Sequence, residues 1–181
     1  MKNLYALAIA SVALLTACGD DDDGPTGGEG SGYTATITGL PGITESSGNA
    51  FWTEGTEEGV TSFVIGLQPS NTAQVGFVIA RTGAGRAAVG NYTFIDNETE
   101  PTPEQFQLFA SLSPYICGAI SGTHNITESG GSRVRGTFTI QGQCASTATQ
   151  EPPVDVTITG TYNALKAPTS VSALSIGRAN N

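Results

Sequence analysis

Three cysteines have the most distinctive chemistry in this sequence: Cys18, Cys117 and Cys144. A thiol can pair in a disulfide or act as a nucleophile. In an exported protein we expect Cys117 and Cys144, which lie 27 positions apart, to form a disulfide, with two free thiols as the alternative. The loop-entropy model gives such a bond about 3 to 4 kcal/mol of stabilisation.

His124 is the only histidine, and therefore the only side chain that ordinarily titrates near neutral pH. It lies on the core-facing side of a predicted strand, near Glu128. No nucleophile elbow, metal-ligand cluster or phosphate-binding loop accompanies it in the sequence. We therefore expect a packed or edge histidine in a protein with no metal, no cofactor and no enzymatic activity.

Two groups of carboxylates in predicted loops keep a hydrolase open as an alternative. A pair held about 5 to 9.5 Å apart across a cleft could hydrolyse a glycoside. Loop acids on an acidic exported domain are more often simply solvated. The groups are Glu54, Glu57 and Glu58 in a hairpin-like loop, and Asp96, Glu98 and Glu100 in another.

Aromatic side chains support a second alternative, a carbohydrate-binding protein or adhesin. Trp52 and Tyr92 could belong to a platform that stacks on sugar rings. Phe51 and Trp52 are adjacent, so on a strand one points inward and the other outward. An exposed Trp52 would favour the platform, whereas a buried Trp52, with Phe51 covered by the N-terminal segment, would not.

The N-terminus is organised like a signal peptide. Lys2 supplies a positive charge, and Leu4 to Leu15 form an apolar run interrupted only by Ser11. A spanning helix needs about 20 apolar residues, so this run is too short to cross a membrane. We predict that residues 1–17 are removed on export.

The apolar run ends in Leu15-Thr16-Ala17-Cys18, which resembles the lipobox of bacterial lipoproteins. The resemblance implies that Cys18 carries a diacylglycerol and anchors the protein to a membrane; the alternative is an ordinary secretory signal with an incidental cysteine. In that family, an Asp after the cysteine is linked to inner-membrane retention. Gly19 occupies this position, so we expect an outer-membrane lipoprotein of the cell envelope, facing the periplasm or the cell surface.

The chain after Cys18 is expected to contain a tether, one domain and a tail. Residues 18–32 are acidic and glycine-rich and offer no hydrophobic surface for a core, so they predict a solvated tether. Asp20 to Asp23 are either a plain spacer or part of a surface-export signal. Residues 33–167 predict the folded domain, and residues 168–181 predict a C-terminal tail or edge strand.

Charge and composition restrict the partners. The formal net charge is −9, and becomes −10 when Lys2 is lost with the signal peptide. Five negative charges lie in the tether, so the folded domain is only mildly acidic. No basic stripe is present, which disfavours nucleic-acid binding. We expect the membrane as a partner through the lipid, and a glycan or an envelope protein as a further one.

Apolar alternation with turn signals predicts an all-β domain, an antiparallel β-sandwich of about 8–9 strands or a small β-barrel. Residues 105–112 alternate except at Phe109 and favour a ninth strand over a short helix. The other predicted strands are Tyr33 to Thr38, Ala50 to Thr53, Thr61 to Leu67, Ala73 to Ala80, Gly90 to Ile95, Tyr115 to Ile126, Arg133 to Gln141 and Val154 to Ala164.

A hairpin is predicted between residues 116–128 and 133–142, with a turn in which Gly130 and Gly131 can take the positive φ that tight hairpins demand. A register that places the apolar side chains of both strands on the same side of the sheet would pair Ile120 with Ile140 and Ile126 with Val134. Cys117 and Cys144 are one residue out of step with this register. We therefore predict a β-bulge near Gly142, or at Gly118, or else a disulfide to a neighbouring loop.

The motif Gly136-Thr137-Phe138 is echoed by Gly160-Thr161-Tyr162. Glycine two residues before an aromatic suggests strands that approach closely, with the ring covering the glycine. The segment from Thr127 to Phe138 and the final Gly-Thr-Tyr-Asn-Ala loosely resemble the C-terminal half of small β-sandwich lipoproteins of unknown function. That resemblance implies no catalytic residues.

These features together predict a lipid-anchored, non-enzymatic β-domain that acts as a binding or interaction module of the cell envelope. A carbohydrate-binding protein using Trp52 and a hydrolase using loop carboxylates are the two alternatives.

Overall fold

The computed structural model describes residues 30–57, 59–70, 76–83 and 85–167. Residues Ser31–Ala167 form one compact unit. The predicted signal peptide, Cys18, most of the predicted tether and the C-terminal segment from Pro168 lie outside the described residues.

Nine strands and no helix make up the described part of the chain, which confirms the all-β prediction. The segment expected as a ninth strand is β6. The strands are β1 (Gly32–Thr38), β2 (Glu45–Glu57), β3 (Val60–Pro69), β4 (Gly76–Thr82), β5 (Gly90–Ile95), β6 (Gln105–Leu112), β7 (Tyr115–Ser129), β8 (Arg133–Ser146) and β9 (Val154–Lys166).

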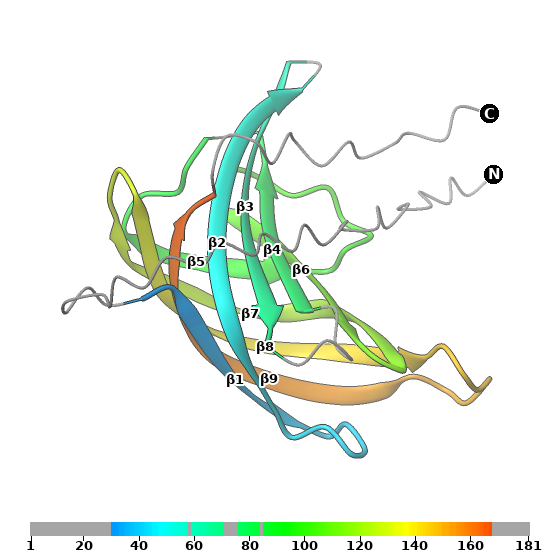
Figure 1. Cartoon of the computed structure of the whole chain (residues 1–181). Helices are drawn as coiled ribbons and strands as arrows, with labels where there is room; N and C mark the ends of the chain where they lie inside the picture. Colours follow the sequence, from blue (N-terminus) through cyan, green and yellow to red (C-terminus); the bar gives the residue numbers. More distant parts are fainter. Residues whose placement is uncertain (1–29, 58, 71–75, 84, 168–181) are drawn as a thin grey trace. The chain divides into compact units, whose positions relative to one another are not determined.

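The strands form one mixed sheet that closes on itself, in the order β1-β2-β3-β4-β6-β5-β7-β8-β9. Most neighbours are antiparallel, while β2 with β9 and β5 with β6 are parallel. Because β1 pairs with both β2 and β9, the first and last strands close the ring. Figure 1 shows β1 in blue lying beside β9 in orange. This closed sheet corresponds to the barrel form of the prediction.

Alternation of inward and outward side chains builds the core. Along β8, every second residue from Val134 to Cys144 is buried, with exposed residues between most of them. The largest fully buried side chains come from most of the strands and form one cluster: Trp52, Phe63, Phe77, Phe106, Ile65, Leu67, Ile79, Leu108, Leu112, Ile126, Ile140 and Ile158.

The hairpin between β7 and β8 forms as predicted, but three details differ from the expectation. Ile140 lies opposite Gly122, and Ile126 lies opposite Gly136, so both pairings differ from those expected. Ile120 is 47% exposed and is not part of the core. The glycines of the turn, Gly130 and Gly131, do not adopt positive φ.

A bulge at Ile120 explains the difference. The register of β7 and β8 shifts between Ala119 and Ser121, where their partners Gly142 and Gln141 are consecutive. The extra residue, Ile120, is left outside the pairing and points to solvent. A second shift, between Ile126 and Glu128, leaves Thr127 outside the pairing close to the turn. A bulge therefore lies near Gly142, as expected, but its extra residue is Ile120 on the opposite strand and neither Gly142 nor Gly118.

The bulge allows the apolar side chains of both strands to face the core while the two cysteines lie opposite each other. Cys117 lies directly opposite Cys144, their Cα atoms are 4.0 Å apart, and the two sulfurs are bonded. Both cysteines are almost completely buried. Without Ile120 as an extra residue, either the cysteines or the apolar side chains of this hairpin would face the wrong side of the sheet.

The second predicted strand is much longer in the structure, extending from Glu45 to Glu57 instead of covering Ala50 to Thr53. Its N-terminal half is rich in Ser, Gly and Asn, which are poor strand formers. Pairing with β1 on one side and β3 on the other stabilises it nonetheless. Neighbouring strands have overridden the local preference.

Candidate functional site

Threonines occupy alternate, outward-facing positions on three neighbouring strands. They are Thr34, Thr36 and Thr38 of β1, Thr137 and Thr139 of β8, and Thr157, Thr159 and Thr161 of β9. The residues between them, such as Ala35, Phe138 and Ile158, are buried. The two-residue period of a strand therefore places every one of these hydroxyls on the outer side of the ring.

The register aligns these threonines in rows across the sheet. Thr36 of β1 lies opposite Thr159 of β9, which lies opposite Thr139 of β8. The row continues to Thr123 of β7 and Thr93 of β5. A neighbouring row consists of Ser47, Thr34, Thr161, Thr137, Asn125 and Asn91. We call these two rows together the hydroxyl face.

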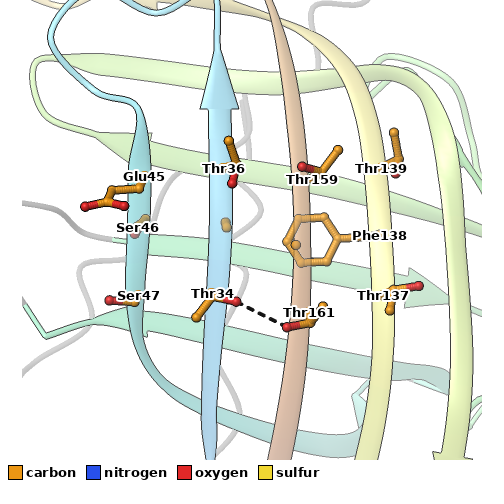
Figure 2. A pocket seen from close by; sticks show the side chains of 12 residues that line it. Thr34, Thr36, Glu45, Ser46, Ser47, Thr137, Phe138, Thr139, Thr159 and Thr161 are labelled. Atoms are coloured by element: carbon orange, nitrogen blue, oxygen red, sulfur yellow. Dashed lines mark hydrogen bonds between the residues drawn. The ribbon is translucent and has the colours of Figure 1, made fainter.

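Part of the hydroxyl face is hollowed, as Figure 2 shows. The hollow has a volume of about 530 Å³ and extends over β2, β1, β9 and β8. Gly160 also lines it, and the ring of Phe138 packs against Gly160. Its polar lining consists of Thr34, Thr36, Glu45, Ser46, Ser47, Thr137, Thr139, Thr159 and Thr161.

Most hydroxyls of this surface face solvent with hydrogen-bonding capacity to spare. Thr34 and Thr161 bond to each other, with their hydroxyl oxygens 3.2 Å apart. Within the described residues, the hydroxyls of Thr36, Thr139 and Thr159 form no hydrogen bond. Each can therefore donate one hydrogen bond and accept two.

Sequence reasoning missed the hydroxyl face. A signal was present, because Thr-x-Thr repeats occur at residues 34–38, 137–139 and 157–161. Threonine is common in strands for its branched side chain alone, so the repeats by themselves do not indicate a site. Only the register of β1, β9 and β8 shows that the repeats meet.

His124 is completely buried inside the ring, as the packed-histidine interpretation expects. Its Nε2 atom lies 2.8 Å from the hydroxyl oxygen of Tyr162. The imidazole stacks on Phe94 and meets the edge of Phe106, with centroids 5.5 and 4.5 Å away. Burial lowers the pKa of His124 to about 3, and burial also raises the pKa of Tyr162. At neutral pH this histidine is uncharged and closed off from solvent.

Trp52 does not form the exposed aromatic platform that the carbohydrate-binding alternative requires. Its side chain is 0% exposed. The cations of Arg86 and Lys166 lie 5.3 and 5.4 Å from its ring, and its indole N–H donates to the carbonyl of Ser132. The inward strand position and these three partners leave no ring face free for a sugar. Trp52 is a core residue.

Phe51 takes the outward position that alternation requires, and its ring covers Gly66 of the neighbouring strand. The expectation that the N-terminal segment covers Phe51 lies outside the described residues.

Tyr92 is half-buried and also has structural partners. Its hydroxyl donates to the carbonyl of Ala88. Its ring meets Phe106 with centroids 5.3 Å apart, and the guanidinium of Arg81 lies 5.6 Å from the ring centre. The structure does not bring Tyr92 together with Trp52 on a common surface, since Trp52 points inward.

The two groups of carboxylates differ from the predicted loops in one respect. Glu54 and Glu57 lie within β2 and not in a hairpin loop, while Glu58 lies outside the described residues. The Oε2 atom of Glu54 accepts a hydrogen bond from the backbone N–H of Arg86. Asp96, Glu98 and Glu100 lie between β5 and β6, where Asp96 accepts from the backbone N–H of Glu98. Among the described residues, no three acidic, histidine or cysteine side chains are placed to hold a metal ion.

No protein-family model, curated protein or solved structure matches this chain. In the described ranges, no helix is long and apolar enough to cross a membrane.

Proposed function

We propose that this protein is a lipid-anchored module of the bacterial cell envelope that binds an envelope component, without catalysis, through the hydroxyl face. The hydroxyl face carries the proposal, because two rows of outward hydroxyl and amide side chains cross up to six strands and surround a hollow. A single exposed threonine is ordinary on a strand. An aligned set with unused hydrogen-bonding capacity is suited to binding a polar surface.

The anchor half of the proposal rests on the residues that precede the folded unit. The positive charge, the apolar run and Leu15-Thr16-Ala17-Cys18 are spaced as in lipoprotein precursors. The lipidated cysteine would be followed by a polar segment before β1 begins at Gly32. Such a segment keeps a binding face clear of the lipid surface and lets it reach partners.

Replacing Cys18 with serine tests the anchor. We expect wild-type protein to fractionate with membranes and to incorporate a radiolabelled fatty acid, and the Cys18→Ser variant to do neither. Protease treatment of intact cells then distinguishes a surface-facing from a periplasmic location. Membrane association of the Cys18→Ser variant with unchanged processing would contradict lipidation at this residue.

Binding by the hydroxyl face is tested with the full mature chain carrying Cys18→Ser, which removes the expected lipid, and isolated bacterial envelopes. The test variant carries Thr139→Val and Thr159→Val, because valine keeps the shape of threonine and removes only the hydroxyl. Thr56→Val and Thr61→Val form a matched control, since these residues also face each other on neighbouring strands but lie outside the face. The proposal predicts that only the first pair weakens envelope binding. Equal binding by all three proteins would overturn it.

A further inference from the structure

The central hydroxyl face carries little charge. Glu45, at the β2 end, is the only ionisable side chain in its two rows and the hollow. On the adjoining outer part of the sheet, Arg135 forms an ion pair with Glu128, with Nε and Oε2 3.3 Å apart. A surface for phosphate or another polyanion needs an excess of positive charge, which this face lacks.

The groups of the face match the hydrogen-bonding pattern of a sugar. Threonine and serine hydroxyls donate and accept, and so do the side-chain amides of Asn91 and Asn125. Sugar hydroxyls also donate and accept. Each threonine adds a methyl group beside its hydroxyl, so polar and apolar contacts alternate over the surface. A neutral polyhydroxyl ligand can satisfy both kinds of contact without bringing a charge.

The dimensions favour a chain of sugars over a single one. The four strands that line the hollow span about 14 Å at the usual spacing between strands, and successive rows are about 7 Å apart. The hollow is an open depression on the sheet and not an enclosed cavity. An open, elongated surface can accept an internal stretch of a polymer, whose ends extend beyond it.

We propose that the hydroxyl face binds a neutral polysaccharide chain lying across β2, β1, β9 and β8. This inference rests on the proposed function of the hydroxyl face and names its ligand class. Recognition depends on Thr36, Thr139 and Thr159, whose hydroxyls are unpaired within the described structure, and not on Trp52. Individual hydrogen bonds to such a surface contribute little, so one site binds weakly. Many anchored copies on one membrane would bind a long polymer far more tightly.

The proposal is tested with the full mature chain carrying Cys18→Ser and with amylose, dextran and cellulose as probes. Alginate is the anionic control polymer. We expect binding to at least one neutral polymer that exceeds binding to alginate and does not weaken with salt. The pair Thr139→Val and Thr159→Val should weaken this binding about tenfold, from the loss of a few hydrogen bonds. The pair Thr56→Val and Thr61→Val should leave it unchanged.

Envelope treatments separate this inference from the proposed function. Periodate cleaves the vicinal diols of sugars, whereas a protease removes protein partners. Loss of envelope binding after periodate but not after protease supports a glycan ligand. Loss after protease alone, or a preference for alginate, overturns the polysaccharide and leaves the binding face in place. Binding that never depends on Thr139 and Thr159 overturns both.

Discussion

Phe138 of β8 lies directly opposite Gly160 of β9, and its phenyl ring fills the space that a side chain on Gly160 would occupy. The neighbouring pair on the same two strands reverses the roles, because Tyr162 lies opposite Gly136 and covers it. The two Gly-Thr-aromatic motifs are thus antiparallel neighbours, each ring covering the glycine of the other. The threonines between them, Thr137 and Thr161, face each other on the outside.

Replacing Gly160 with alanine should lower the free energy of unfolding by roughly 1 to 3 kcal/mol, because the new Cβ would overlap Cζ of Phe138. Urea denaturation measures the change. Adding Phe138→Leu should recover part of the loss, since it removes the ring contact. Gly131→Ala is the control, with nothing within 4 Å of the added atom. Equal effects of the two alanine substitutions would disprove the ring contact as the cause.

Removing the disulfide with Cys117→Ala and Cys144→Ala should lower the free energy of unfolding by about 3 to 4 kcal/mol in the loop-entropy model. The size of this loss follows from the separation of 27 residues between the two cysteines. Denaturation of the wild type with and without a reductant provides a second measurement. Cys18→Ser should not change the midpoint. An identical midpoint for oxidised and reduced protein would show that the bond contributes nothing.

Acid should destabilise the fold through His124. The unfolded chain protonates this histidine near pH 6.5, whereas burial holds its pKa at about 3 in the folded state. Between these values the unfolded state binds the extra proton, so stability falls as pH falls, by roughly 1.4 kcal/mol per pH unit. Urea midpoints measured at pH 6.5 and pH 5 test this expectation. Both pH values lie largely above the range in which carboxylates titrate.

The double variant His124→Phe and Tyr162→Phe is the matched control for this pH dependence. It removes both partners of the buried hydrogen bond together and so leaves neither polar atom of the pair unpaired. We expect a flatter stability profile between pH 6.5 and 5. A slope equal to that of the wild type would contradict titration of His124.

Trp52 is the single tryptophan, so intrinsic tryptophan fluorescence reports its environment directly. A fully buried indole should emit at short wavelength and resist quenching by iodide until the protein unfolds. Adding a polysaccharide should leave this emission unchanged, because the hydroxyl face is on the outside of the ring. Strong iodide quenching of folded protein would contradict the burial of Trp52.

Local pattern was sufficient to predict much of the fold. The segment Gly90 to Ile95 was predicted with its observed bounds, and the bulge beside Gly142 followed from the step between Cys117 and Ile126. The individual pairs of the hairpin were wrong because the extra residue is Ile120 of β7, which moves the partners of Ile140 and Ile126 by two residues from those expected. The polar start of β2, from Glu45 to Asn49, was missed because its stability comes from β1 and β3.

The candidate site was less accessible to prediction. Trp52 and Phe51 had to face opposite sides, but which of them faced inward depended on the closure of the ring, and Trp52 proved to be buried. Trp52 and Tyr92 are candidates by residue type alone, since aromatic side chains are frequent in sugar-binding sites. The hydroxyl face consists of residue types that are common on protein surfaces. Only their alignment across neighbouring strands marks it as a candidate binding site.

The sequence by itself determined which residues alternate, that the domain is all-β, and that Cys117 and Cys144 could meet only through an irregular strand. Only the tertiary structure decided that β1 joins β2 to β9, that Trp52 is internal, and that Thr36, Thr159 and Thr139 stand in one row. The physical reason is one of range. Alternation is a property of one strand, whereas a row across a sheet depends on the register of strands distant in sequence.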